Sequence, residues 1–296
     1  MLTLKNNRED FYPVALTVSS SDSGGSSGVQ ADLRTFNAAG VFGCSVITAV
    51  TAQNPCAIKR QEVLSPDLVT AQLSAVIPAL AVKAVKIGML GNSAVLRSVC
   101  DFFRKHKLPL IVDASMINRF GEYLLEKDAL LLMKNDLLSL ASMIILNTRE
   151  AEWLLNRKLT SAEDRFAGAL ALAEEYKCQI LLENDPASDS AQNKICDIAV
   201  LDGELFLLAS PVPGELDAAS AQGMDCAFSS GIAAMISTGS SWKNALCAAK
   251  AHVYGSLCET AHVGKELDCM YPPLEDYSSQ VSLRLFRPNS DKKGRK

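Results

Sequence analysis

The chain has 296 residues, of which 48% are hydrophobic, 21% charged and 6% aromatic. This composition supplies a large apolar core and excludes a mostly disordered chain. With 29 Lys and Arg against 33 Asp and Glu, the formal net charge is −4, and six of the basic residues fall between 284 and 296. The body of the chain is therefore acidic, which argues against nucleic acid as a partner.

The cysteines and the start of the chain indicate a reducing compartment. Nine cysteines are scattered without a CxxC pair, so neither a zinc site nor a disulfide framework is indicated. Residues 1–13 are polar and carry no signal-peptide core, and no window of about 18 apolar residues is free of charge. We therefore expect a cytoplasmic protein that does not enter a membrane.

Short β-branched runs alternate with longer segments of helical spacing along the whole chain. The pattern predicts strands at 13–19, 45–51, 81–90, 108–113, 143–146 and 179–182, with a hairpin of 195–201 and 205–209 around Asp202-Gly203. It predicts helices at 29–39, 66–80, 92–106, 128–140, 148–155, 161–176, 226–238 and 241–262, with caps at Asp128 and at Ser161 with Asp164. Such alternation is typical of an α/β fold with a parallel sheet and helices on both faces.

The chain contains no linker long enough to separate two domains. We expect a flexible N-terminus at 1–12, a single domain at 13–270 and a polar, basic tail at 271–296. In a parallel sheet, ligands bind at the carboxyl ends of the strands, so the residues that follow each strand are the candidates for a site.

The loop after the first strand is rich in small residues and contains Gly24, Gly25 and Gly28. It is not a Walker A loop, because no Gly-Lys-Ser/Thr follows. By its residues alone it is either a phosphate cradle or a plain tight turn. Asp32, one turn into the next helix, either complements the helix dipole or serves a site.

Three motifs in chain order carry a family resemblance. They are S-D-S-G-G-S-S-G-V-Q-A-D at 21–32, S-V-I-T-A-V-T-A-Q-N at 45–54 and K-I-G-M-L at 86–90. Together they resemble the hydroxymethylpyrimidine and phosphomethylpyrimidine kinases of thiamine synthesis, in the ribokinase-like superfamily, over about residues 13–263. The resemblance implies a three-layer α/β/α sandwich with a mostly parallel central sheet. It also implies phosphorylation of 4-amino-5-hydroxymethyl-2-methylpyrimidine by ATP with Mg²⁺, the monophosphate as a second candidate substrate, and a homodimer.

The resemblance extends to the pyrimidine pocket. Gln53 matches the glutamine that reads the ring nitrogen and the exocyclic amine, and its amide offers a donor and an acceptor for that edge. Asp32 matches the acid near the polar groups of the substrate, and Met89 matches the apolar residue against the ring. Ser20 stands where the family has a glycine.

The phosphoryl-transfer motif departs from the family pattern. The family's His-Gly-Thr-Gly-Cys reads Q-G-M-D-C here, so Gly223 remains and Asp225 replaces the second glycine. Cys226 matches the residue that deprotonates the substrate hydroxyl. A carboxylate about 4–5 Å from the γ-phosphate costs around 4 kcal/mol at an effective dielectric near 20, which is about a thousandfold in rate. Alternatively, Asp225 itself takes the proton.

A second acid enters on the same side of the site. The family's Lys-Gly-Gly-His reads E-N-D-P at 183–186, which places Glu183 where a phosphate-facing lysine is expected. Asn147 and Glu150 match the pair that holds magnesium through water. The other matching positions are Asp113, Met116, Arg119, which replaces a lysine, and Asp217.

Three functional hypotheses follow. The first is a working pyrimidine kinase that uses the residues above. The second is a catalytically weakened relative that binds a pyrimidine or pyridoxal-like ligand without efficient phosphoryl transfer, because the ring pocket is kept and the phosphate side is altered. The third is a kinase for another vitamin-like alcohol, against which Gln53 in T-A-Q-N favours the pyrimidine.

Overall fold

The computed structural model describes the chain except for residues 1–11, 116–126, 184–193, 215–220, 266 and 288–296. Its strands are β1 (Val14–Asp22), β2 (Phe42–Asn54), β3 (Ala57–Val63), β4 (Val82–Ile87), β5 (Leu110–Asp113), β6 (Met143–Asn147), β7 (Gln179–Glu183), β8 (Lys194–Leu201), β9 (Glu204–Pro211), β10 (Ala261–Gly264), β11 (Leu267–Cys269) and β12 (Ser282–Leu285). Its helices are α1 (Gly28–Ala38), α2 (Pro66–Val76), α3 (Ser93–Lys105), α4 (Lys127–Leu132), α5 (Thr148–Leu155), α6 (Ala162–Tyr176), α7 (Met224–Ser237) and α8 (Trp242–Cys258).

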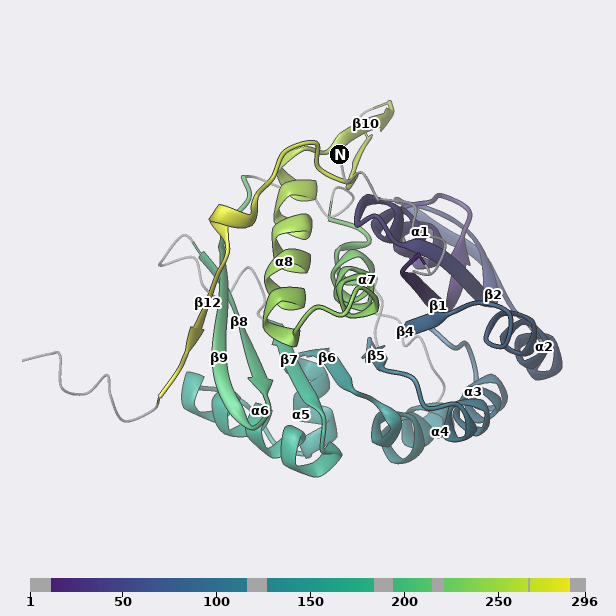
Figure 1. The fold of residues 1–296 in the computed structure, drawn as a ribbon, viewed down its shortest axis with the longest axis horizontal. Coiled ribbons are helices and arrows are strands. Elements are labelled where there is room, and N and C mark those ends of the chain that lie inside the picture. Colours follow the sequence, from purple (N-terminus) through teal and green to yellow (C-terminus); the bar gives the residue numbers. More distant parts are fainter. Residues whose placement is uncertain (1–11, 116–126, 184–193, 215–220, 266, 288–296) are drawn as a thin grey trace, which may run out of the picture.

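Ten of the described strands form one sheet, in the order β12-β9-β8-β7-β6-β5-β4-β1-β2-β3. The central strands from β2 to β7 run parallel, and the pairs toward the two sides are antiparallel. Helices α1, α7 and α8 cover one face of this sheet, and α2 to α6 cover the other (Figure 1). The predicted three-layer α/β/α sandwich with a mostly parallel sheet is therefore confirmed.

Strand β6 shows why the central strands read as continuous apolar runs. Ile144 and Leu146 belong to the core under α2 to α6, whereas Met143 and Ile145 belong to the core under α7 and α8. Successive side chains point to opposite faces, and all four are at most 1% exposed. Burying each of these side chains contributes about 1.5–3 kcal/mol, so the strand is fixed at the centre of the sheet.

The ends of the helices follow the local sequence. The Ser65 hydroxyl accepts a bond from the Leu68 amide ahead of Pro66, and Ser161 forms the predicted capping box with Asp164. The expected cap at Asp128 is wrong, because Asp128 lies inside the first turn of α4. The expected helix at 128–140 is also divided, since a π-helical turn (Met133–Leu137) and a 3-10 turn (Leu138–Leu140) follow α4.

Four strands were not predicted from the sequence: β3, β10, β11 and β12. Strand β10 begins at Ala261, so the last long helix ends at Cys258 and not near residue 262. Strand β12 pairs antiparallel with β9. The part of the expected tail that the structure describes therefore includes a strand of the main sheet.

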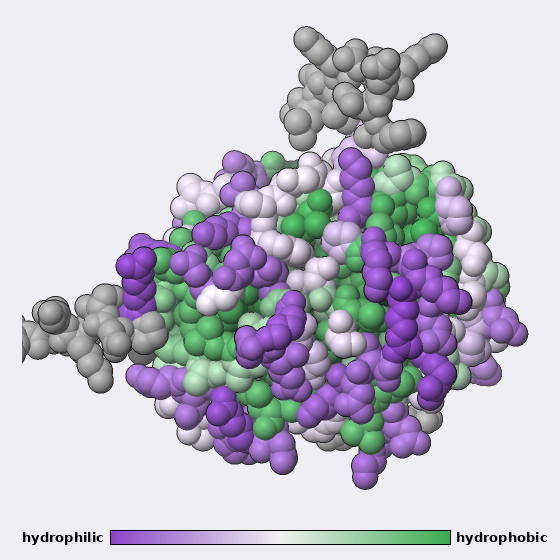
Figure 2. Space-filling view, turned by 60° about the horizontal axis from the view of Figure 1, so that its bottom comes forward, coloured by the Kyte–Doolittle hydropathy of each residue, from purple (hydrophilic) through white to green (hydrophobic). Residues whose placement is uncertain are grey.

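The helix-covered side formed by α2 to α6 is turned toward the viewer in Figure 2. Hydrophilic side chains extend across this face, and hydrophobic areas lie exposed between them. Among the described residues, no helix combines the length and the apolar character that crossing a membrane requires.

The parallel strands place the candidate residues along one edge of the sheet. Asp113, Asn147 and Glu183 are the last residues of β5, β6 and β7, and Gln53 lies at the end of β2. The carboxyl ends of parallel strands face the same way, so residues far apart in sequence share one cleft.

Candidate functional site

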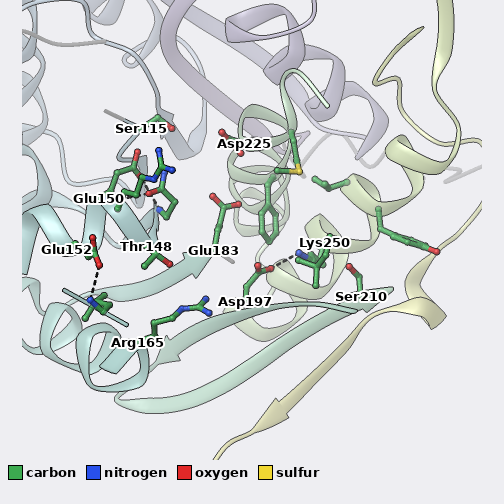
Figure 3. Close-up of a pocket in the computed structure, with 18 of the residues that line it drawn as sticks. Ser115, Thr148, Glu150, Glu152, Arg165, Glu183, Asp197, Ser210, Asp225 and Lys250 are labelled. Carbon is green, nitrogen blue, oxygen red and sulfur yellow. Dashed lines mark hydrogen bonds and ion pairs between the residues drawn. The ribbon is translucent and has the colours of Figure 1, made fainter. Parts of the chain in front are cut away.

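Two cavities open along this edge of the sheet. The larger has a volume of about 960 Å³ and the smaller about 410 Å³. Ser115, Met224 and Asp225 line both, so the cavities meet at the first turn of α7. Figure 3 shows the larger one, with Glu183 and Asp225 directed into it from opposite sides.

The smaller cavity contains the expected pyrimidine-pocket residues with one exception. Ser20, Gln53 and Met89 line it together with Gly223 and Cys226. The Gln53 amide nitrogen donates a 3.0 Å bond to the Ser27 hydroxyl, which fixes the orientation of the amide. The exception is Asp32, which lies outside the lining.

Asp32 is fully buried behind Lys86, and Lys86 is the residue that reaches the cavity. The Lys86 ammonium lies 3.0 Å from both carboxylate oxygens of Asp32, and the Thr17 hydroxyl donates to the same carboxylate. Burial lowers the pKa of Lys86, but the charge and hydrogen bond of Asp32 together with the effects of Cys226 and Asp113 more than offset this, so the net shift is upward and the ammonium stays charged. Burial also raises the pKa of Asp32, and Lys86 opposes that rise. Asp32 therefore lies behind Lys86 and outside the lining of the cavity, and its role near the polar groups of the substrate stays a prediction.

The first loop is organised by Asp22, whose role the sequence analysis missed. Its carboxylate accepts bonds from the amides of Gly24, Ser26 and Ser27 at 2.7, 3.1 and 2.9 Å, and from the Ser27 hydroxyl at 2.9 Å. An aspartate followed by small residues is a known signal for such a turn. The loop is therefore a fixed wall of the cavity, and through Ser27 it holds Gln53.

The same loop packs against the start of α7 at Gly223. Gly223 has φ +88°, and a Cβ at this position would come within 1.9 Å of the Ser26 carbonyl oxygen. Only glycine adopts this positive φ without strain and leaves room for the Ser26 carbonyl oxygen. Gly223 therefore lets the first turn of α7 lie close to the first loop.

Cys226 lines the smaller cavity as a protonated thiol. Burial raises its pKa to about 12, and the opposing effects of Lys86 and of the Gly28 amide are smaller. A thiol in this state is a weak proton acceptor at neutral pH. The raised pKa therefore disfavours the thiolate that Cys226 would need in order to deprotonate the substrate, as the resemblance implies.

Asp225 and Glu183 influence each other across the larger cavity. Asp225 is surrounded by protein but keeps an exposed surface toward the cleft. Burial and Asp113 raise its pKa to about 6, against the opposing charge of Lys86. Burial, followed by the charges of Asp225 and two further aspartates, raises the pKa of Glu183 well above its usual range.

These shifts revise the charge argument made from the sequence. The pKa of about 6 leaves Asp225 ionised at neutral pH, whereas the raised pKa of Glu183 favours its neutral form. The repulsion of a triphosphate expected from Glu183 is thereby weakened.

Positive charge in the larger cavity comes from residues to which the sequence analysis gave no role. Lys250 on α8 forms a buried 2.6 Å ion pair with Asp197 on β8. Arg165 on α6 also lines the cavity, and its Nε and Nη2 atoms are buried without a hydrogen-bond partner among the described residues. Guanidinium donors of this kind are suited to phosphate oxygens. Figure 3 shows Arg165 on the same side of the cavity as Glu183 and Asp197.

The expected magnesium pair lies at the wall of the larger cavity. Asn147 and Glu150 form a capping box at the start of α5, with bonds of 3.0 and 2.8 Å between side chain and backbone in the two directions. Both line the cavity, and their oxygen donors are of the type that Mg²⁺ prefers. In the described part of the chain, no three His, Cys, Asp or Glu side chains gather as a metal-binding group. These residues therefore fit a magnesium ion that keeps water and phosphate ligands.

Three positions matched by the resemblance, Met116, Arg119 and Asp217, lie outside the described residues, as does the segment at 184–186.

Comparison with known proteins places this geometry in a family. The chain matches the family model described as phosphomethylpyrimidine kinase over residues 22–270. It is 34% identical to the hydroxymethylpyrimidine/phosphomethylpyrimidine kinase of Rhizobium meliloti over 245 residues, which cover 82% of this chain and 90% of that protein. The protein of the same name from Haemophilus influenzae is 33% identical over 253 residues, which cover 84% of this chain and 93% of that one.

Solved structures agree with this assignment. The phosphomethylpyrimidine kinase from Clostridium difficile superposes with a TM-score of 0.71 at 28% identity, covering 81% of this chain and 97% of that one. A pyridoxal kinase from Staphylococcus aureus has a TM-score of 0.81 at 22% identity, covering 94% and 100%, and at that identity the likeness concerns the fold alone. The chain therefore belongs to the phosphomethylpyrimidine kinase family of ribokinase-like kinases.

Proposed function

We propose that the protein phosphorylates 4-amino-5-hydroxymethyl-2-methylpyrimidine with ATP, a step of thiamine synthesis. The observation that carries the proposal is the meeting of two cavities of different chemistry at the start of α7. The smaller holds a fixed glutamine amide, apolar side chains and the Lys86 ammonium, and the larger holds Lys250 and Arg165. A phosphoryl group passes from one bound molecule to the other only where such cavities join.

Three residues would place the pyrimidine in the smaller cavity. The Gln53 amide pairs with the ring nitrogen and the exocyclic amine, Met89 packs on the ring, and Ser20 lies at the edge of the ring. The Lys86 ammonium, held by Asp32, supplies a fixed positive charge at the floor of the same cavity. This charge suits the hydroxyl oxygen as negative charge develops on it.

The larger cavity would hold ATP. The ion-paired Lys250 lines this cavity together with Arg165, two of whose guanidinium nitrogens are buried without a partner among the described residues. Mg²⁺ would be held through water by Asn147 and Glu150, and when bound it would neutralise phosphate charge. Catalysis of phosphoryl transfer rests mainly on positioning and charge neutralisation, and the walls of this cavity supply both.

The second candidate is a protein that binds the pyrimidine or a pyridoxal-like ligand without efficient transfer. Asp225 favours it, since a carboxylate at the junction opposes the γ-phosphate. The raised pKa of Glu183 weakens this alternative, because it disfavours the charged carboxylate that would repel the triphosphate.

Calorimetric titration separates the two candidates. The kinase requires that the pyrimidine and MgATP each bind the purified protein, and that Gln53→Ala abolishes binding of the pyrimidine alone. Gln280→Ala, at an exposed position on the surface, is the matched control. Binding of the pyrimidine without MgATP would favour the binding protein, and pyrimidine binding unaffected by Gln53→Ala would contradict both.

We also propose a cytoplasmic location, which agrees with nine cysteines that form no disulfide among the described residues and with the use of ATP. The homodimer and phosphorylation of the monophosphate stay predictions, to be checked by light scattering and by supplying the monophosphate as the acceptor.

A further inference from the structure

Asp225 has a position that no other titratable residue of the described chain shares. Of the three residues that line both cavities, Ser115 and Met224 carry no group that titrates near neutral pH. If the alcohol occupies the smaller cavity and ATP the larger, the hydroxyl and the γ-phosphorus approach each other at this junction.

We propose that Asp225 is the catalytic base of the reaction, in place of Cys226. The inference rests on the proposed function, because it requires an alcohol in the smaller cavity. An Asp225 oxygen accepts the proton of the hydroxyl while the hydroxyl oxygen forms a bond to the γ-phosphorus. The bond between that phosphorus and the bridging oxygen of ADP breaks, and ADP leaves with the electron pair. Asp225 then releases the proton to water.

The neighbouring acids are less well placed for this step. Glu183 lines only the larger cavity, so it does not reach an alcohol in the smaller one. Asp113 lines the smaller cavity, but its Oδ1 already accepts bonds from the amide and the hydroxyl of Ser115.

The environment of Asp225 also suits a base. Burial and Asp113 at the end of β5 oppose its ionised form, and Lys86 on β4 favours it. Glu183 at the end of β7 lies in the same cavity, and its own pKa is raised by burial and by Asp225. The ion pair of Lys250 with Asp197 lies farther along the same cavity. The resulting pKa of about 6 leaves Asp225 ionised at neutral pH and basic enough to take a proton. Cys226, one residue later, is a thiol under the same conditions.

The inference gives a different expectation from the view that Asp225 is only an obstacle. If Asp225 only repelled the γ-phosphate, its removal in Asp225→Gly, which restores the family residue, would raise kcat. A base is not replaced by glycine or asparagine. Both Asp225→Gly and Asp225→Asn are then expected to lower kcat by about 10²–10⁴-fold.

The test is steady-state kinetics of the full chain with hydroxymethylpyrimidine and MgATP across pH, for the wild type, Asp225→Asn, Asp225→Gly and Cys226→Ser. Asp101→Asn, an exposed carboxylate on α3, controls for the change in net charge. We expect kcat of the wild type to fall at acidic pH as one group becomes protonated. This decrease, the acidic limb of the pH profile, should be absent in Asp225→Asn and present in Cys226→Ser. Calorimetry with the pyrimidine confirms that each variant is folded and binds.

The outcomes separate the inference from the proposed function. The inference alone is overturned if the wild type turns over and the kcat of Asp225→Asn lies within about threefold of the wild-type value. A kcat of Asp225→Gly above the wild-type value overturns it in the same way. Loss of the acidic limb in Cys226→Ser overturns it as well. Absence of turnover in the wild type contradicts the proposed function and, with it, the inference.

Discussion

The Lys86 ammonium contacts both carboxylate oxygens of Asp32 at 3.0 Å, with side-chain exposures of 1% and 0%. These residues come from β4 and α1, 54 positions apart. Taking two charges out of water is costly, and close contact with additional hydrogen bonds is needed to offset that cost. Thr17 supplies one such bond, and the smaller cavity gains a fixed cation at its floor.

Removing the carboxylate of this pair should strongly destabilise the protein. Asp32→Ala leaves the Lys86 ammonium buried without its partner, so we expect the free energy of unfolding to fall by about 3–5 kcal/mol. Urea denaturation of the purified variant measures this change.

Asp101→Ala is the matched control for that experiment. Asp101 pairs with Arg104 on the surface of α3, and both side chains are largely exposed. Loss of such a pair costs about 0–1 kcal/mol. Equal effects of the two substitutions would show that Lys86 finds another partner or water when Asp32 is absent.

Gly223→Ala tests the contact between α7 and the first loop. Gly223 and Gly239 both have a positive φ, at +88° and +85°, but only at Gly223 does a Cβ meet an atom within 4 Å. We expect Gly239→Ala to cost about 1–2 kcal/mol of stability through backbone strain alone. Gly223→Ala should cost more and weaken pyrimidine binding, because the first turn of α7 must move away from Ser26. Similar melting temperatures and pyrimidine affinities for the two variants would contradict this contact.

Asp225→Asn should change the pH dependence of stability in a defined direction. The pKa of Asp225 is raised from 3.8 to about 6, so the folded state binds the proton more tightly than the unfolded state. Stability of the wild type therefore falls as pH rises between these values, and the loss persists above the higher one. Asparagine does not titrate, so the variant should exceed the wild type in melting temperature at about pH 8, by a larger margin than at about pH 4. The same margin at both values would show that Asp225 is not perturbed.

Glu183→Gln tests whether Glu183 is neutral in the native protein. A protonated glutamic acid and a glutamine carry the same charge, so the dissociation constant for MgATP should change by less than about threefold. Glu183→Lys, which introduces the cation of the family motif, should lower that constant by about tenfold, because a positive charge is added beside the triphosphate. A large gain in affinity from Glu183→Gln would show that Glu183 is ionised and that the repulsion expected from the sequence is real.

Much of the fold was predictable because apolar periodicity reports burial. The central strands and their crossover helices all appear near the predicted positions. The missed strands lie at the edges of the sheet or outside it, where burial leaves little pattern. The side chains of β3 (Ala57–Val63) are exposed except for the half-buried Val63, so it resembles a loop. In β12 the alternation of Leu283 and Leu285 is short and adjoins basic residues, so it was attributed to the tail.

The candidate site was predictable where motif and geometry coincide, as at Gln53 and Met89. The positions of Asp32 and Lys86 could not be read from the sequence, because only the packing of α1 on the sheet decides which of the two reaches the cavity. The ionisation of Glu183 was likewise hidden. It depends on burial and on Asp197 and Asp225, which distant segments of the chain bring near.

The most direct test of the account is product formation by the wild-type protein. Purified protein, hydroxymethylpyrimidine, ATP and Mg²⁺ are mixed, and the phosphorylated products are identified and quantified by phosphorus NMR. The account predicts that the phosphate ester of the pyrimidine alcohol and ADP form in equal amounts, over many turnovers. Binding of both substrates by calorimetry with no phosphate ester formed would contradict it and would identify Asp225 as a barrier to phosphoryl transfer.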